Sequence, residues 1–343
     1  MARIHSSEEE LIDRIRTHVP SAPQGALRLG IGDDAAVIRP TPNREWVVTS
    51  DQFIEGVHFL AASQPPESIG YKALARATSD IGAMGGKPVL FLLSICLPAE
   101  RTGLWLDKLA KGMGQAARRF GLVLAGGDTA RSSPGNNAVA MDLTVLGDIR
   151  SGRAIGRGGA QPGDAVFVSG VLGESQLGLE SILRGLAKER RWRKLLEPHF
   201  YPKINLDLGR WLAENRFVSA MMDVSDGLST DLRRLCQASQ VGSQIYEDKL
   251  PCVTVPITLR SKGIDSKMLA LHGGEDYGLL FTVRRRLIKK IPRIFRGQRV
   301  TQIGEIVAGS EITLVSNKCS SLLAPQGWDH FRKVRPVRIR ART

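Results

Sequence analysis

Residues 217–228 read Phe-Val-Ser-Ala-Met-Met-Asp-Val-Ser-Asp-Gly-Leu, a mainly apolar run that leads into an acidic turn. The segment 217–223 has the length and apolar character of a buried strand. Beyond the turn, Leu228, Leu232 and Leu235 recur at the spacing of one helix face. The stretch therefore predicts a strand, a tight turn and a helix, which is the building unit of sheets layered with helices.

The same alternation of strands and helices continues on both sides of this stretch. Apolar periodicity predicts helices at residues 7–18, 66–84, 104–120, 175–186 and 204–214. Short apolar runs predict strands at residues 35–38, 46–49, 89–97, 122–124, 139–146 and 165–169. A Gly- and Arg-rich stretch, residues 147–163, divides the chain. We therefore expect two domains of layered sheets and helices, residues 1–149 and 150–343.

The composition is that of an ordinary globular protein. The chain has 343 residues, of which 42% are hydrophobic and 24% are charged, and this length is enough for two cores. No apolar run approaches the ~18 residues of a membrane span, and the first residues show no secretory signal. The four cysteines form no C-x-x-C pair, which argues against structural zinc and for a reducing compartment. We therefore expect a cytoplasmic protein that does not contact a membrane.

The net charge of +14 is unevenly distributed. Residues 283–343 hold 15 Lys and Arg against 3 Asp and Glu, so this segment alone accounts for +12. A basic patch by itself attracts nucleic acid only through non-specific contacts to phosphate. The default interpretation is a solvated helix face followed by a loosely held terminus, residues 333–343. The charge therefore does not indicate nucleic-acid binding, although it could help to steer anionic ligands.

Acidic residues recur in five small turns spread over both halves of the chain. Each predicted turn combines Asp with Gly, Ser or Thr, at residues 32–35, 49–51, 79–80, 126–129 and 223–227. Any one of them alone is most simply an Asx turn or a helix cap. If the fold gathers them, their carboxylates would repel one another unless they hold protons or bind cations. An all-oxygen site of this kind suits Mg²⁺, which leaves coordination positions open for phosphate.

Three further residues are candidate ligand contacts. His58 is either a half-buried histidine or a contact, and Glu275 lies in a turn that would be an acidic contact if it faced a cleft. Trp328 is by default a core or covering residue.

Two phosphate-binding fingerprints are excluded, because Gly30–Ala35 runs into a strand and Gly85–Pro88 lacks the Ser or Thr of a P-loop. No Ser-His-Asp order indicates a covalent nucleophile.

Together, these segments resemble the thiamine-monophosphate kinase family, within the aminoimidazole-ribonucleotide synthetase superfamily. The matching segments follow one another in order from about Gly30 to Phe331, and they are Gly30–Ala36, Ser50–Phe59, Tyr71–Gly85, Gly126–Thr129, Asp223–Leu228 and Gly273–Tyr277. The resemblance implies an N-terminal α/β domain that forms a β-barrel with a second copy in a homodimer, followed by an α+β domain. It also implies ATP-dependent phosphorylation of thiamine monophosphate to thiamine diphosphate, by direct in-line transfer with Mg²⁺.

The resemblance further implies roles for individual residues. It places Mg²⁺ at the oxygen-bearing residues Asp34, Thr49, Ser50, Asp51, Asp80, Asp128, Asp223 and Asp226. Of these, the catalytic carboxylates would be Asp80, Asp128 and Asp223. It places ATP at Gly127, Asp128, Arg157 and Ser225, and thiamine phosphate at His58, Glu275 and Trp328. These residue types suit their roles, since an indole stacks on a cationic ring and an arginine binds phosphate.

Two other interpretations remain open. Another ATP-dependent enzyme of the superfamily, of the selenophosphate synthetase or cyclo-ligase type, would share the acidic turns. Selenophosphate synthetases usually carry a reactive Cys or selenocysteine near the N-terminus, whereas the first cysteine here is Cys96, within an apolar strand. A basic nucleic-acid-binding protein would leave the acidic turns without a role.

Overall fold

The chain forms two compact units in a computed structural model. The structure describes residues 8–31, 35–39, 41–133, 135, 137–186, 190–316 and 319–331. The first unit comprises Met1–Gly156 and Phe200–Val218, and the second comprises Arg157–His199 and Ser219–Thr343. The division therefore falls at 156–157, whereas the sequence places it at 149–150. The difference arises because the last strand of the first unit continues to Arg150, and because the segment 200–218 returns to that unit.

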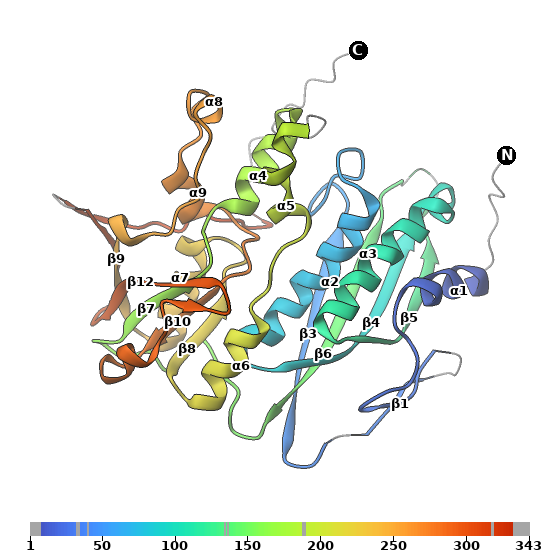
Figure 1. Ribbon diagram of the computed structural model, residues 1–343, viewed down its shortest axis with the longest axis horizontal. Coiled ribbons are helices and arrows are strands. Elements are labelled where there is room, and N and C mark those ends of the chain that lie inside the picture. The colour runs from blue at the N-terminus through green and yellow to red at the C-terminus, as the bar shows by residue number, and fades with distance from the viewer. Residues whose placement is uncertain are drawn as a thin grey trace. The chain divides into compact units, whose positions relative to one another are not determined.

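The first unit is built around one sheet with the strand order β3-β6-β4-β5 (Figure 1). Its helices are α1 (Glu8–His18), α2 (Pro66–Ala83), α3 (Leu104–Phe120) and α6 (Leu206–Asn215). Its strands are β1 (Leu27–Leu29), β2 (Val37–Ile38), β3 (Arg44–Ile54), β4 (Lys87–Leu97), β5 (Val123–Arg131) and β6 (Ala140–Arg150). β6 runs antiparallel to both β3 and β4, whereas β5 runs parallel to β4.

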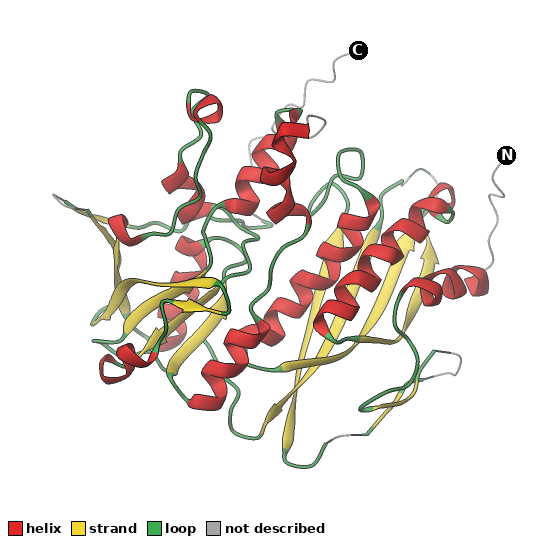
Figure 2. Cartoon of the chain, viewed as in Figure 1, coloured by secondary structure: helices red, strands yellow, loops and turns green. Residues whose placement is uncertain are grey.

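Helices α2 and α3 lie side by side on one face of this sheet (Figure 2). Their close approach depends on Gly112, because a Cβ atom there would lie 1.8 Å from the carbonyl oxygen of Glu67. Phe53 and Phe91 of the sheet are fully buried in the core beneath the helices. On the other face, Leu27 of β1 packs against apolar residues of β4 and β5. The sheet therefore has one face covered by helices and one that is only partly covered.

The second unit is built around a larger sheet with the strand order β14-β13-β9-β12-β7-β10-β8, in which β11 also pairs with β12. Its helices are α4 (Glu174–Leu183), α5 (Arg193–Phe200), α7 (Leu228–Ser239), α8 (Ile257–Arg260) and α9 (Ser266–His272). Its strands are β7 (Ala165–Ser169), β8 (Val218–Asp223), β9 (Gly242–Tyr246), β10 (Leu279–Val283), β11 (Ile294–Phe295), β12 (Gln298–Val307), β13 (Ile312–Val315) and β14 (Ser320–Leu322). Short 3-10 helices lie at Ala99–Arg101, Arg190–Trp192, Glu247–Lys249 and Arg285–Lys290.

The stretch 217–228 folds as its sequence predicts. β8 ends at Asp223, a turn follows, and α7 begins at Leu228. Leu228, Leu232 and Leu235 are fully buried, and they pack with apolar residues of the sheet in the core of the second unit. This strand, turn and helix therefore place the acidic turn at the end of a buried strand.

Two of the acidic segments lie within strands, where turns were expected. Residues 49–51 are in the middle of β3, and residues 126–129 are within β5, paired with β4. The expectation was wrong because Gly, Asp and Ser have low strand propensity, so the local signal favours a turn. Pairing with neighbouring strands along their whole length overrides that local preference.

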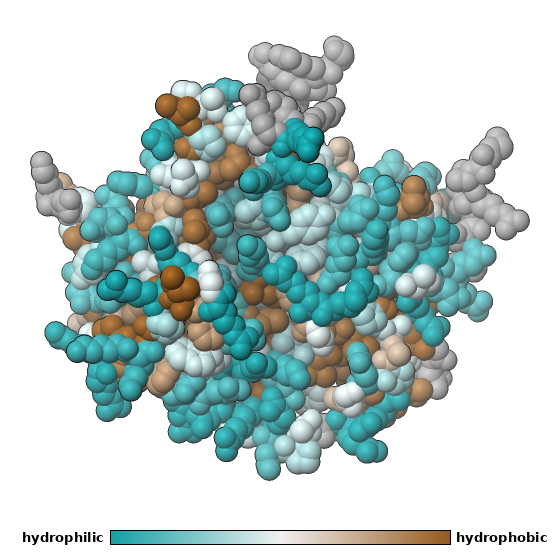
Figure 3. Space-filling view, viewed as in Figure 1, coloured by the Kyte–Doolittle hydropathy of each residue, from teal (hydrophilic) through white to brown (hydrophobic). Residues whose placement is uncertain are grey.

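No helix in the described part of the chain is both long and apolar enough to cross a membrane. Figure 3 shows mainly hydrophilic residues on the face it presents, with apolar residues in scattered patches. On this face, the pattern is that of a surface in contact with water.

Candidate functional site

In the first unit, β3 and α2 bring three of the candidate residues together. The hydroxyl of Thr49 donates a 2.6 Å hydrogen bond to Oδ2 of Asp80. The carboxylate of Asp51 accepts hydrogen bonds of 3.2 and 3.3 Å from Arg76. Residues two apart share one face of a strand, and residues four apart share one face of a helix, so both pairs form between β3 and α2. This side of the sheet therefore holds two carboxylates, one hydroxyl and one compensating positive charge.

Ser50 points to the opposite face of the sheet, because successive side chains of a strand alternate. Its Oγ lies 2.9 Å from Oδ1 of Asp142 and 3.1 Å from Oγ1 of Thr144, both on β6. The hydroxyl of Ser50 and the side chains of its two neighbours therefore lie on different faces. A single ion held by the side chains of residues 49 and 51 cannot also be reached by the hydroxyl of Ser50.

Asp128 lies on this second face, in a polar row that crosses the sheet. In the strand register, Gln52 pairs with Asp142, Asp142 with Ser94, and Ser94 with Asp128. The last three of these residues line an open cavity of about 1090 Å³. Its apolar lining includes Ile12, Ile31, Ile38, Leu90 and Leu146. A cavity with carboxylates and an apolar wall suits a ligand that has an aromatic base and polar groups.

The packing of the sheet requires glycine at position 127, whether or not a ligand binds there. A Cβ atom at this position would lie 1.8 Å from the carbonyl oxygen of Leu93, on the neighbouring strand β4. Close pairing of β5 with β4 therefore requires glycine here. The same pairing positions the exposed Asp128 that follows it.

His58 lies in the turn that follows β3. Its Nδ1 accepts a 3.0 Å hydrogen bond from the backbone N–H of Ile54, and its ring stacks on Phe53 with 5.8 Å between ring centroids. Because Nδ1 accepts, the proton of the neutral imidazole is on Nε2. The half-buried ring is therefore held in one tautomer, with Nε2–H as its donor.

In the second unit, three segments that are far apart in the chain meet, and we call this the turn junction. Its segments are residues 223–227, 273–277 and 326–328. The backbone N–H of Glu275 donates a 2.7 Å hydrogen bond to the carbonyl of Ser225, and that of Trp328 donates a 2.9 Å hydrogen bond to the carbonyl of Asp226. Asp223, almost completely buried, ends the strand that leads into the junction. The fold therefore brings these predicted residues together.

The backbone of the turn junction is tightly packed and partly strained. A Cβ atom at Gly274 would lie 2.6 Å from the carbonyl oxygen of Ser225, and one at Gly327 would lie 2.0 Å from that of Asp226. Glu275 adopts a left-handed φ of 66°, which is uncommon for a residue other than glycine. Such strain persists only where the surrounding structure over-determines the conformation, and it is frequent at functional sites.

Asp231, in the first turn of α7, holds the acidic turn of the junction from inside. Its Oδ2 accepts hydrogen bonds of 3.0, 3.0 and 3.1 Å from the backbone N–H groups of Ser225, Asp226 and Gly227. Its Oδ1 accepts a 2.9 Å hydrogen bond from Arg234, which also binds the carboxylate of Asp226. Burial and the neighbouring Asp226 raise the pKa of Asp231 to about 7. This one carboxyl group therefore sets the conformation of the turn.

Asp276 and His199 hold the second turn of the junction. The carboxylate of Asp276 accepts hydrogen bonds of 2.6 Å from the backbone N–H of Gly173 and 3.1 Å from that of Ser175, at the start of α4. The buried ring of His199 places Nδ1 3.0 Å from Oγ of Ser175 and 3.5 Å from Oε2 of Glu275. The Glu275 carboxylate, about a quarter exposed, is therefore directed by groups on α4 and α5.

Trp328 combines a fixed backbone with an accessible ring. The residue is 41% exposed, and its indole meets His330 edge-on with 5.5 Å between ring centroids. Its backbone is fixed by the hydrogen bond to the acidic turn of the junction. Of the two default expectations, a core residue is excluded by this exposure and a covering residue is not, and the exposed indole can stack on a ligand.

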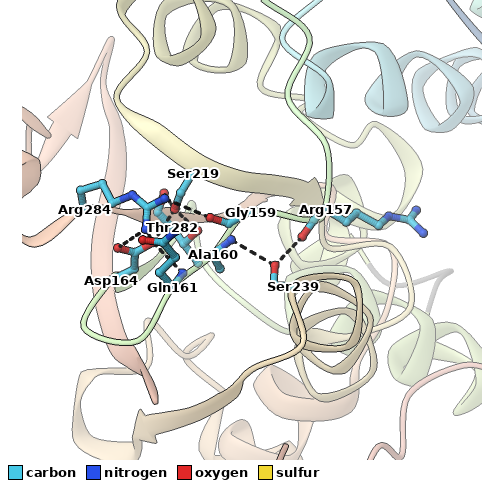
Figure 4. Close-up of polar contacts among 9 residues, drawn as sticks. All are labelled: Arg157, Gly159, Ala160, Gln161, Asp164, Ser219, Ser239, Thr282 and Arg284. Carbon is cyan, nitrogen blue, oxygen red and sulfur yellow. Dashed lines mark hydrogen bonds and ion pairs between the residues drawn. The ribbon is translucent and has the colours of Figure 1, made fainter. Parts of the chain in front are cut away.

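Arg157 lies away from the turn junction. Its carbonyl accepts a 3.0 Å hydrogen bond from Ser239, the last residue of α7 (Figure 4). The turn junction, with Ser225, adjoins the first residue of that helix. At 1.5 Å per residue the helix is roughly 18 Å long, so the two ends are well separated. The structure therefore does not bring Arg157 next to Ser225, and only an extended ligand could meet both.

The described residues do not form a cluster of metal-binding side chains. Within them, no three Asp, Glu, His or Cys side chains lie close enough together to hold a metal ion. Asp34 lies outside the described residues, as does the basic segment 333–343. The candidates that are described offer carboxylate and hydroxyl oxygens, which is the donor chemistry of Mg²⁺. The gathering of all five acidic segments around Mg²⁺ stays a prediction.

Several side chains of these sites were not singled out in the sequence, among them Asp142, His199 and Asp231. A signal existed for Asp231, because an acidic residue in the first turn of a helix can accept hydrogen bonds from the N–H groups that precede the helix. No local signal exists for His199, which meets Glu275 only through tertiary folding. Asp142 sits in a strand among apolar residues, and only the register of three strands aligns it with Asp128.

Family models match both halves of the chain. The model described as AIR synthase related protein, N-terminal domain, matches residues 32–149. The model described as AIR synthase related protein, C-terminal domain, matches residues 161–317. The fold is thus the two-domain fold that the resemblance implies.

Curated relatives and solved structures cover nearly the whole chain. The thiamine-monophosphate kinase of Synechococcus elongatus is 33% identical over 310 residues, which are 88% of this chain and 91% of that protein. The one from Bacillus subtilis is 33% identical over 314 residues, which are 90% and 94% of the two chains. A crystal structure of thiamine-monophosphate kinase from Stenotrophomonas maltophilia is 32% identical with a TM-score of 0.76, and covers 89% of this chain and 95% of that one.

Two further solved structures are similar to this chain. One is described as AaThiL complexed with AMPPCP and TMP, and it is 31% identical with a TM-score of 0.73 over 94% of this chain and 97% of that one. The hydrogenase maturation protein HypE has a TM-score of 0.74 but is only 19% identical, so it shares the fold alone. The resemblance drawn from the acidic segments is confirmed, and the chain belongs to the thiamine-monophosphate kinase family.

Proposed function

We propose that this protein transfers the terminal phosphoryl group of ATP to thiamine monophosphate and thereby forms thiamine diphosphate. The observation that carries the proposal is the turn junction, which joins an acidic turn, a directed glutamate and an accessible tryptophan through backbone hydrogen bonds. The relative described as complexed with AMPPCP and TMP supports a nucleotide and a thiamine phosphate as the two ligands. A nucleic-acid-binding role would not explain why the acidic turn, the glutamate and the tryptophan of the turn junction lie together.

The proposed mechanism is direct in-line transfer, in which positioning and electrostatics do most of the work. Glu275 and Trp328 would bind the cationic thiamine end, and His58 would donate Nε2–H to an acceptor oxygen of the substrate. Asp80, Asp128 and Asp223 would be the catalytic carboxylates, and because Asp80 and Asp128 lie on opposite faces of the sheet, they would contact different parts of the bound phosphates. Mg²⁺, when bound, would neutralise charge on those phosphates. The residues proposed to hold it are Asp34, Thr49, Ser50, Asp51, Asp80, Asp128, Asp223 and Asp226.

A coupled assay of ADP release tests this function. With thiamine monophosphate as acceptor, we expect turnover that depends on ATP and Mg²⁺, and thiamine diphosphate as the product. Thiamine and other phosphate monoesters are the comparison acceptors. Equal turnover with unrelated acceptors, or none with thiamine monophosphate, would contradict the proposal.

Replacing Trp328 by Ala should separate the two substrates. Loss of the indole removes about 1–2 kcal/mol of stacking and cation–π contact, so the KM for thiamine monophosphate should rise about 5- to 30-fold. The KM for ATP should stay near that of the parent protein. Steady-state kinetics with each substrate varied in turn measure both constants.

Phe331→Ala is the matched control for this prediction, because Phe331 is an aromatic residue in the same segment and is 98% exposed. We expect it to change neither KM. If Trp328→Ala raised both KM values equally, the indole would serve the structure of the unit rather than thiamine binding.

We also propose a homodimer that joins the partly covered sheet faces of two first units into a barrel. On this face Val48 is 59% exposed and Leu92 is 36% exposed, and an exposed apolar sheet face is usually covered by a partner. The family resemblance implies the same arrangement. The outer strands β3 and β5 would then pair with strands of the second copy, which removes unpaired sheet edges.

Sedimentation equilibrium at micromolar concentration should therefore show a dimer. Val48→Asp places a charge on the proposed interface, and we expect it to shift the protein toward monomer. Ile257→Asp is the control, because Ile257 is 81% exposed on α8, in the second unit. A parent protein that is monomeric and fully active would contradict the proposed dimer.

A cytoplasmic location is part of the proposal. The four cysteines, Cys96, Cys236, Cys252 and Cys319, are all free. Burial raises the pKa of Cys236 to about 12, so this thiol stays protonated and unreactive. Free thiols are typical of proteins that remain in a reducing compartment.

A further inference from the structure

Residues 157–160 form a tight loop that packs on the last turn of α7 (Figure 4). The hydroxyl of Ser239 donates a 3.0 Å hydrogen bond to the carbonyl of Arg157. Oγ of Ser239 also accepts a 3.1 Å hydrogen bond from the backbone N–H of Ala160. A single hydroxyl group therefore ties both ends of the loop to the helix.

The middle of this loop is held from another direction. Arg284 donates a 3.3 Å hydrogen bond to the carbonyl of Gly159 and forms a 3.2 Å ion pair with the buried carboxylate of Asp164. Gly159 has a φ of 120°, and a Cβ atom there would lie 2.5 Å from the carbonyl oxygen of Ser219. The middle of the loop is thus held by Arg284, whereas its two ends are held by the hydroxyl of Ser239.

The side chain of Arg157 contrasts with its backbone. Its guanidinium forms no hydrogen bond or ion pair with any residue that the structure describes, and Figure 4 shows it pointing away from the polar contacts around the loop. Arginine binds phosphate through a planar fork of N–H donors, so its affinity depends on the direction in which that fork is presented. Arg157 therefore combines a fixed backbone with a guanidinium that has no partner among the described residues, and this combination is suited to binding an anionic ligand.

We infer that Ser239 is a positioning residue that directs Arg157 toward a phosphate group of ATP. The inference rests on the proposed function, which assigns Arg157 to ATP. Without the Ser239 hydroxyl, both ends of the loop lose their tie to α7. Binding of ATP must then order the loop as well as the side chain, and that ordering lowers affinity. Thiamine monophosphate binding, assigned to the turn junction at the other end of α7, is unaffected.

The test compares Ser239→Ala, Arg157→Ala and the double variant. Titration calorimetry with AMPPCP measures nucleotide binding without turnover, and steady-state kinetics measure the KM for each substrate. Ser239→Ala should weaken AMPPCP binding and raise the KM for ATP by about 5-fold, the value of one ordinary hydrogen bond. The KM for thiamine monophosphate should not change. In the Arg157→Ala background, Ser239→Ala should have no further effect, because the group it positions is gone.

Two control variants accompany the test. Ser239→Thr keeps the hydroxyl and should retain the parent affinity. Ser261→Ala removes an exposed hydroxyl that contacts only a nearby carbonyl at the end of α8, and it should change nothing.

The outcomes distinguish the inference from the proposal beneath it. If Arg157→Ala leaves nucleotide binding unchanged, the assignment of Arg157 to ATP fails, and the inference fails with it. If Arg157→Ala weakens binding but Ser239→Ala does not, only the positioning role is overturned. Additive losses in the double variant would also overturn it, because they would show that Ser239 acts on the unit independently of Arg157.

Discussion

Asp80→Asn is expected to lower kcat by about 100-fold or more while the protein stays folded. Asp80 lies on α2 against β3, where the hydroxyl of Thr49 donates a 2.6 Å hydrogen bond to its carboxylate. Asn keeps the shape and can still accept that hydrogen bond, but it carries no charge to hold a divalent cation. Kinetics at saturating Mg²⁺ and ATP, together with circular dichroism, measure activity and fold separately.

Asp107→Asn is the control for Asp80→Asn. Asp107 is also a helical carboxylate of the first unit, but it is paired with Arg14 at 2.8 Å and lies outside the proposed site. It should leave kcat within a small factor of the parent value. Near-parent turnover of Asp80→Asn would remove Asp80 from the proposed set of Mg²⁺-binding residues.

Asp231→Ala is expected to destabilise the second unit by about 3 kcal/mol, because a buried backbone donor that loses its acceptor costs about 1–3 kcal/mol. The side chain of Asp231 is completely buried. The change would leave three backbone N–H groups of the acidic turn without their acceptor, and Arg234 would lose one of its two carboxylate partners. Hydrogen exchange should show faster exchange in the peptide that covers residues 224–228, and thermal melting should begin at a lower temperature.

Asp265→Ala is the comparison for this change. Asp265 accepts one hydrogen bond of 2.8 Å from the backbone N–H of Lys267 as the cap of α9, and the contact is exposed. Loss of such a cap costs about 1 kcal/mol. Protection of residues 224–228 that matched the parent protein in Asp231→Ala would show that the turn does not depend on this carboxyl group.

The sequence alone was sufficient for the elements that carry a strong periodic pattern. The run 217–228 predicted β8, the turn and α7, because a buried strand and a one-sided helix have different apolar periods. Helices α2 and α3 were predicted for the same reason. The family was also recognisable, because short acidic segments in a fixed order form a specific set even when each one is weak.

The sequence was insufficient where the decisive contacts are not local. Residues 49–51 and 126–129 have the composition of turns, yet they lie within β3 and β5 because long neighbouring strands pair with them. The separation of the Ser50 hydroxyl from Asp51 follows from strand alternation, which could be applied only after residues 49–51 were known to be in a strand.

The organisation of the site shows the same division. Composition and order along the chain determined which acidic, glycine and aromatic residues were candidates, since those chemical properties belong to single residues. Tertiary structure alone decided that the turns around Ser225 and Glu275 and the segment of Trp328 share one junction, and that Arg157 lies at the far end of α7. The physical reason is that hydrogen bonds between distant segments depend on sheet order and helix packing, which arise from burial of the whole core rather than from any local pattern.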